Sequence, residues 1–221
     1  MPIVRFSLAV ACATATPVAT AQTANPLAGD TQAPDTSSAT NSIGGLIIPE
    51  ASRGKLLPDA ASGGVAFADE LGWYRFTMAD GGTTELEGTM RKFSFEAGTL
   101  PTTCFAVRIP DASLAKFSVA QIQAEIETLY PSFDALVLSS GFEIVHRESL
   151  KLDSAGQRSA VPVKLMAWDS RESGGMRVTW TLMPSPVGQL AFACGGADPG
   201  HHREVIQRYL RIGEGMMPAP K

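Results

Sequence analysis

The sequence predicts an exported α+β domain, built as an antiparallel sheet of about six or seven strands flanked by two helices. Three observations lead to this fold class. Several short segments alternate apolar and polar residues, which is typical of strands with one buried face. Two other segments repeat apolar residues at helical spacing. The first 21 residues have the features of an export signal, and exported proteins fold where disulfides can form.

The N-terminus carries the three parts of a signal peptide. Arg5 supplies the positive charge, and residues 6–15 form a short, mostly apolar stretch. Ala19-Thr20-Ala21 then provides the small residues that a signal peptidase requires, which makes Gln22 the expected first residue of the mature protein. The stretch is well short of the roughly 18 to 20 apolar residues that span a bilayer. We therefore expect residues 1–21 to be a signal peptide and the mature protein to be periplasmic or secreted.

Composition divides the remaining chain into three parts. Residues 22–66 are expected to be a flexible leader, because most of this segment is Ala, Thr, Ser, Pro, Asp and Gly, with little apolar surface to bury. Its apolar cluster around Ile47 is either a docking segment or a short adhesive one. Residues 67–214 are expected to form a single domain, and residues 215–221 a tail.

Seven segments of the domain are predicted strands. The clearest is 176–182, where Met176, Val178, Trp180 and Leu182 alternate with polar residues. The other six are 73–78, 91–95, 104–109, 142–152, 161–168 and 189–194. Turn-forming residues at 153–157 and 170–175 connect the later strands as a meander.

Both predicted helices have recognisable ends. The first begins at Ser118, which forms a capping-box pattern with Gln121, and we expect Pro131 to end it. The second begins at Asp198-Pro199 and is expected to end at Gly213. Each helix has one apolar stripe, so both should pack on the sheet.

The charged residues argue against two classes of partner. The chain has 18 basic and 22 acidic residues, a formal net charge of −4, and its basic residues are scattered singly. Nucleic acids and anionic membrane surfaces attract concentrated positive charge, so neither is expected as a main partner. After residue 21 no apolar stretch is long enough to span a membrane, and we expect no membrane-spanning segment.

Two cysteines remain once Cys12 leaves with the signal peptide. Cys104 and Cys194 are an even pair without the C-x-x-C spacing of redox sites, so we expect a structural disulfide between them.

The order of the predicted elements resembles the PsbP and DcrB type of exported domain. The resemblance rests on the strand 104–109 leading to the helix at Ser118, on Ser159-Ala160-Val161-Pro162 opening a strand, and on the strand 189–194 before the last helix. It covers about residues 67–214. Proteins of this type are mostly accessory or binding modules, and the resemblance implies neither a catalytic set nor a cofactor.

No catalytic motif occurs in the sequence, and we assign no catalytic residue. A reduced Cys194 together with His201 and His202 could hold copper or zinc, although adjacent histidines on a helix point about 100° apart and chelate one ion poorly. His146 lies on a predicted strand and is expected to be half-buried. These residues leave two alternatives open, a hydrolytic or metal-dependent enzyme and a soft-metal carrier.

Two tryptophans suggest a possible binding surface. Trp73 and Trp168 fall among polar neighbours on predicted strands, whereas Trp180 belongs to an apolar face. Exposed aromatic residues mark partner surfaces, and with His146 these two could form one; alternatively, a helix covers them on the second face of the sheet. The hypothesis we favour is a non-catalytic accessory or binding module whose partner is an envelope protein or a small ligand.

Overall fold

The computed structural model describes residues 42–43, 46–47, 49–59, 62, 64–78, 81–98, 100–152, 163–196 and 198–218. The chain divides into two units, and all described residues belong to the second, Asn41–Lys221. The expected signal peptide at 1–21, most of the leader, residues 159–162 and the end of the tail lie outside the described residues. A two-residue ladder, β1 (Ser42–Ile43) with β2 (Leu46–Ile47), precedes the domain.

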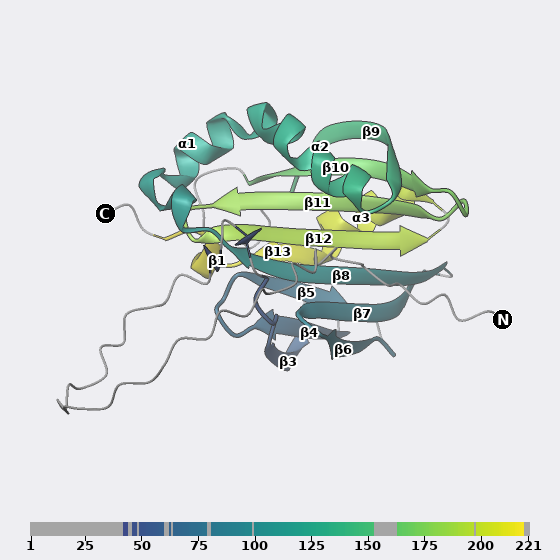
Figure 1. Ribbon diagram of the computed structural model, residues 1–221. Coiled ribbons are helices and arrows are strands. Elements are labelled where there is room, and N and C mark those ends of the chain that lie inside the picture. The colour runs from purple at the N-terminus through teal and green to yellow at the C-terminus, as the bar shows by residue number, and fades with distance from the viewer. Residues whose placement is uncertain are drawn as a thin grey trace, which may run out of the picture. The chain divides into compact units, whose positions relative to one another are not determined.

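Two antiparallel sheets form the domain (Figure 1). The large sheet has seven strands, in the order β6 (Thr83–Glu87), β7 (Met90–Ala97), β8 (Leu100–Pro110), β12 (Gly188–Gly196), β11 (Arg177–Ser185), β10 (Lys164–Glu172) and β9 (Phe142–Lys151). The small sheet has four, in the order β13 (Leu210–Ile212), β5 (Tyr74–Met78), β4 (Gly64–Asp69) and β3 (Gly54–Asp59). The antiparallel α+β class is therefore confirmed, and the single sheet of the prediction is replaced by two.

An aromatic core joins the two sheets. Phe76 of the small sheet lies 4.7 Å from Phe93 and 5.0 Å from Phe192 of the large sheet, measured between ring centroids. Phe67 on β4 is 5.6 Å from Phe93. All four rings are almost fully buried. Alternation on β5, β7 and β12 directs these side chains to one face of each sheet, so the predicted period of two produced this core.

Helices pack on the second face of the large sheet. The chain between β8 and β9 contains η1 (Ala112–Lys116), α1 (Val119–Ala124), η2 (Ile126–Leu129) and α2 (Tyr130–Ser139). Figure 1 shows α1 and α2 along one side of the sheet. Strand β10 shows that two faces are covered, because Leu165 and Ala167 belong to the aromatic core while Trp168 contacts rings on α2.

The first predicted helix is interrupted and then continues beyond its expected end. Ser118 and Gln121 form the predicted capping box. The helix ends at Ala124, however, and Pro131 lies in the first turn of α2 rather than stopping a helix. Proline is tolerated there because the first-turn amides have no intrahelical partner. The described residues thus contain three α-helices, not the two we expected.

The last helix, α3 (Pro199–Tyr209), begins as predicted and ends early. Asp198 caps it, accepting a hydrogen bond from the Gly200 amide, and Pro199 occupies the first turn. The chain leaves the helix at Leu210 because Leu210–Ile212 pairs with β5 as strand β13. A short turn, η3 (Glu214–Met216), follows.

Paired strands occur before residue 67. Strands β3 and β4 pair with each other, and β3 and the first residues of β4 fall within the segment 22–66 that is expected to be a flexible leader. Strand β3 lies at the edge of the small sheet and is mostly exposed, so it lacks the apolar alternation that reveals a strand. No described helix is long and apolar enough to cross a membrane.

Candidate functional site

The predicted disulfide connects the central strand of the large sheet, β12, to its neighbour β8. Cys104 on β8 and Cys194 on β12 are direct register partners, with Cα atoms 4.1 Å apart. Both residues are fully buried in the aromatic core. A soft-metal carrier that used Cys194 would need a free thiolate, and this sulfur is bonded to Cys104.

Helix α3 directs three consecutive polar side chains to three different places. His201 Nε2 lies 3.1 Å from the Thr102 hydroxyl on β8. His202 is buried against the large sheet. Arg203 reaches β9 and β10, where it pairs with Glu148 and with Asp169. The two histidines therefore point apart, as expected for neighbours on a helix, and no cluster of three potential metal ligands occurs among the described residues.

The surroundings of His202 keep its ring neutral. Burial lowers the pKa of His202 to about 4, and the nearby His201 acts in the same direction, whereas Asp198 and Asp169 oppose the shift. Its Nδ1 atom has no hydrogen-bond partner among the described residues. The ring fits because position 196 is glycine: a Cβ atom there would lie 2.8 Å from His202 Nε2.

Arg203 forms the centre of a polar network beside this ring. Its guanidinium donates to Glu148 and lies 3.4 Å from Asp169 Oδ2. The Thr179 hydroxyl on β11 donates to the other oxygen of Asp169 over 2.8 Å. The carboxylates and the guanidinium are thus satisfied within the network, which ties α3 to three strands of the large sheet.

His146 lies at the outer side of this network. A bulge leaves Val145 as an extra residue between two paired positions, since Asp169 pairs with His146 and Ser170 with Ile144. The His146 side chain is 56% exposed, and its Nε2 is 4.0 Å from Glu148 Oε2. The expectation of a half-buried His146 is therefore wrong, because strict alternation does not continue through a bulge.

A groove runs between α3 and the hairpin that joins β7 to β8. It has a volume of about 340 Å³ and is lined by Ala97, Gly98 and Leu100 from the hairpin and by His201, Glu204, Val205, Arg208 and Tyr209 from the helix. Leu100 is 44% exposed. The Arg208 guanidinium lies 5.4 Å from the centroid of the Tyr209 ring. The groove therefore combines the exposed Leu100 side chain with charged groups along the helix, and partner sites commonly contain both kinds of group.

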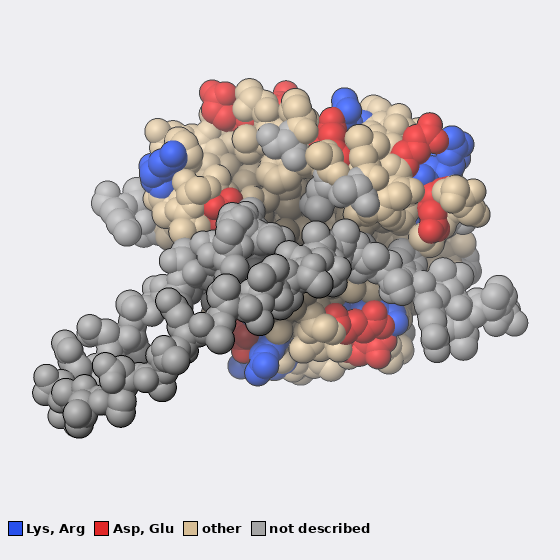
Figure 2. Space-filling model, viewed as in Figure 1, with Lys and Arg blue, Asp and Glu red and all other residues tan. Residues whose placement is uncertain are grey.

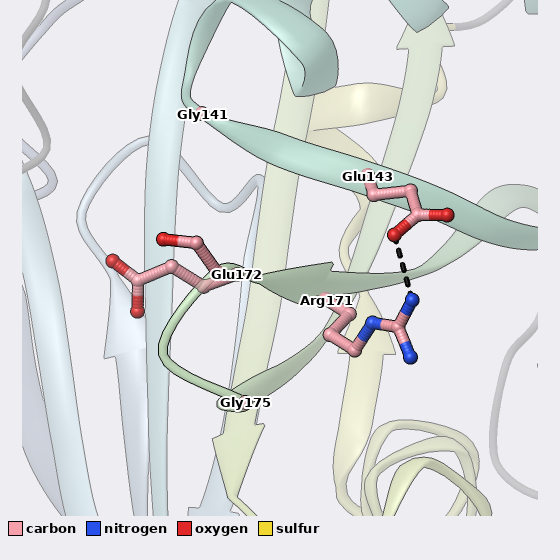
Figure 3. Close-up of a pocket in the computed structure, with 6 residues that line it drawn as sticks. Gly141, Glu143, Arg171, Glu172 and Gly175 are labelled. Carbon is pink, nitrogen blue, oxygen red and sulfur yellow. Dashed lines mark hydrogen bonds and ion pairs between the residues drawn. The ribbon is translucent and has the colours of Figure 1, made fainter.

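A second groove of about 520 Å³ lies between the start of β9 and the turn that joins β10 to β11, lined by Gly141, Glu143, Arg171, Glu172, Ser173 and Gly175 (Figure 3). Figure 3 shows the Glu143 and Arg171 side chains directed at one another. The Arg171 guanidinium nitrogen and the Glu143 carboxylate oxygen form an ion pair and are 2.7 Å apart. The cation of this groove is therefore already paired with a carboxylate, whereas Arg208 in the groove beside α3 has no ion-pair partner among the described residues.

Neither tryptophan of the expected binding surface is exposed. Trp168 is 1% exposed, and its Nε1 donates to Asp134 on α2 over 2.8 Å. Trp73 is 5% exposed and belongs to the aromatic core. The alternative, that a helix covers the second face of the sheet, holds for Trp168, whereas Trp180 is only half-buried. The prediction of Trp73 and Trp168 as surface residues is therefore wrong.

A buried polar cluster that no sequence pattern predicts lies at the end of β4. Arg108 on β8 pairs with Asp69 and donates to the backbone oxygen of Ala51. The hydroxyl groups of Ser52 and Tyr74 are 2.6 Å apart beside them. All the side chains of this cluster are buried, so it fastens the segment before β3 to both sheets and offers no access to a ligand.

Comparisons with known proteins identify no relative of this chain. No protein-family model matches it, and no curated protein has a significantly similar sequence.

Proposed function

We propose that this protein is an exported accessory or binding module without catalytic activity, and that it binds a partner protein of the cell envelope along the groove between α3 and the β7–β8 hairpin. The groove itself is the observation that carries the proposal. It leaves Leu100 exposed near the half-buried Tyr209, so a partner side chain would bury the apolar surface of Leu100.

The charges along the groove support binding as well. Glu204 and Arg208 are exposed, and neither has an ion-pair partner among the described residues, although their spacing of four would allow them to pair. In contrast, Arg203 on the neighbouring face of α3 is fully engaged with Glu148 and Asp169. These two charged side chains therefore line the same groove as the exposed Leu100, where they can orient an incoming segment.

Export and general surface charge are consistent with this proposal. A buried disulfide is typical of proteins that fold outside the cytosol. On the face drawn in Figure 2, basic and acidic groups lie interspersed, with no extended basic area among the described residues. Such a surface favours recognition through local contacts over attraction to a polyanion.

Site-specific photocross-linking in the native compartment tests the proposal. A photoreactive residue replaces Leu100 in the groove, and in a matched protein it replaces Leu138 on α2, which is 54% exposed. We expect a discrete adduct from position 100, at least five-fold weaker with Arg208→Glu, and none from position 138. Equal labelling at both positions, or no adduct at 100, would refute the groove as the binding site.

A native mass spectrum of the protein purified from the periplasm separates a protein partner from a small ligand. A bare, oxidised monomer agrees with a protein partner that is lost during purification. A retained small-molecule adduct would instead show that the protein binds a small ligand. If position 100 also gives no cross-link to a protein, the groove is not a binding site for a protein partner.

A further inference from the structure

We propose that the N-terminal half of α3 is an acid-sensitive latch: in acid it leaves the large sheet while the two sheets remain folded. The proposal does not depend on the groove being occupied. It rests on two features of the same helix, the buried ring of His202 and the ion pairs of Arg203.

The first feature is the buried ring of His202, whose surroundings disfavour a positive charge. His202 is 1% exposed, and its Nδ1 has no partner among the described residues. Its Nε2 faces the backbone at Gly196 so closely that a methyl group there would collide with it. A proton added to this ring creates a buried cation without a hydrogen-bonded counter-ion, which is strongly unfavourable. Moving the helix outward lets water reach the ring.

The second feature is the weak attachment of the neighbouring side chain. Arg203 is held by Glu148 on β9 and Asp169 on β10. The side chains of Arg203 and Glu148 are 29% and 35% exposed, and ion pairs with such exposure add little to stability. These contacts therefore cannot offset the cost of a buried charge on the same turn of the helix.

The other groups around α3 do not compensate for this. Asp198 and Asp169 favour a charged His202, but their effect is smaller than that of burial, and His201 opposes it. On β11 and β12 the neighbouring Thr179 and the bonded Cys194 do not titrate. The charged or titrating side chains of β5 and β13, the strands of the small sheet that α3 contacts, are engaged elsewhere: Tyr74 with Ser52, Arg75 with Asp59, and Arg211 with the carbonyl groups of Gln207 and Leu210.

The C-terminal half of α3 has a different attachment. Val205 and Ile206 are buried in the aromatic core, and the chain continues directly into β13, which is paired with β5. These apolar and backbone contacts do not depend on pH. Opening is therefore confined to the first turns, and it separates His201 and Glu204 from the hairpin side of the groove.

Nuclear magnetic resonance on the full mature chain tests the latch. Backbone amide signals of residues 200–204 and of β11 and β12 are followed from pH 7 to pH 3.5, together with the ring signals of each histidine. We expect the signals of residues 200–204 to lose their helical chemical shifts with a midpoint near pH 4, where the His202 ring charges, while the signals of the strands keep theirs.

Two matched variants assign the transition to His202. His202→Phe keeps a buried ring that cannot charge, and its helix should stay in place down to pH 3.5. His146→Phe removes an exposed histidine and should leave the transition unchanged. In case His202→Phe does not fold, the ring signals of the unmodified protein remain decisive. A helix that stays bound after the ring has charged, or strands that unfold together with the helix, would overturn the proposal.

Discussion

Arg108 and Asp69 form an ion pair inside the protein, with Nη1 and Oδ1 3.3 Å apart and side chains 3% and 0% exposed. The pair connects β8 of the large sheet to β4 of the small sheet. Burial raises the pKa of Asp69, although the amides of Trp73 and Leu71 and the charge of Arg108 oppose this shift. The guanidinium therefore stabilises a carboxylate that would be costly to bury alone.

Removing this arginine should be far more damaging than removing an exposed one. Arg108→Met leaves a buried, uncompensated carboxylate and is expected to lower the free energy of unfolding by about 3 to 5 kcal/mol. Arg75→Met breaks the more exposed pair with Asp59 and should cost less than about 1 kcal/mol. Urea unfolding measures both, and equal losses would show that the buried pair does not hold the sheets together.

The disulfide should contribute strongly to stability. Cys104 and Cys194 are separated by 90 positions. Closing a loop of this length lowers the entropy of the unfolded chain, which raises the free energy of unfolding by roughly 4 to 5 kcal/mol. The double variant Cys104→Ala/Cys194→Ala is expected to lose about that much relative to the oxidised protein. Thermal and urea unfolding with and without a reductant check this, and an unchanged midpoint would contradict it.

Gly196 should tolerate no side chain while His202 is present. Gly196→Ala places a methyl group 2.8 Å from the His202 ring and should destabilise by about 1 to 3 kcal/mol. Gly174→Ala is the matched control, because its Cβ atom would meet only Glu172, at 3.9 Å. Adding His202→Ala should make the Gly196→Ala change nearly neutral. Strictly additive losses in this double-mutant cycle would refute the contact.

His202 should also make the global stability depend on pH. Its folded pKa, about 4, lies below the ordinary value of 6.5, so the unfolded chain binds a proton more readily. Its contribution is fully present above pH 6.5 and declines as the pH falls toward 4. Between pH 7.5 and pH 5 the loss is about 2 kcal/mol. Urea unfolding of His202→Phe should show a loss smaller by that amount, whereas His146→Phe should match the unmodified protein.

Trp168 should behave as a core residue. Trp168→Ala removes a ring that is buried under α2 and is expected to cost about 3 to 5 kcal/mol. Leu138→Ala on the exposed side of the same helix should change stability by less than about 0.5 kcal/mol. Chemical denaturation followed by circular dichroism measures both. A neutral Trp168→Ala would restore the interpretation of this residue as part of a binding surface.

Local signals predicted the parts of the fold that depend on neighbouring residues. The alternation at 176–182 corresponds to β11, and the Ser118 capping box and the Asp198 cap occur where they were expected. These features depend on contacts within a few residues, and such contacts can be recognised in the sequence. His201 and His202 also lie on the helix that was predicted to begin at Asp198.

Signals of the same kind failed where a distant partner decided the outcome. Pro131 was expected to end a helix and instead lies in the first turn of one, because α2 packs on β9 and on Trp168. Strand β3 has little apolar pattern and forms only because β4 pairs with it. The groove beside α3 and the buried polar cluster around Arg108 each combine segments that are remote in sequence, so no local pattern could reveal them.

The sequence by itself determined the strand and helix segments with strong periodicity, the caps at the start of two helices and the only cysteine pair available after position 21. The tertiary structure alone decided that there are two sheets, what covers each face of the large one, and which polar residues are enclosed. The physical reason is that alternation shows how the two faces of a strand differ, whereas burial depends on what packs against each face.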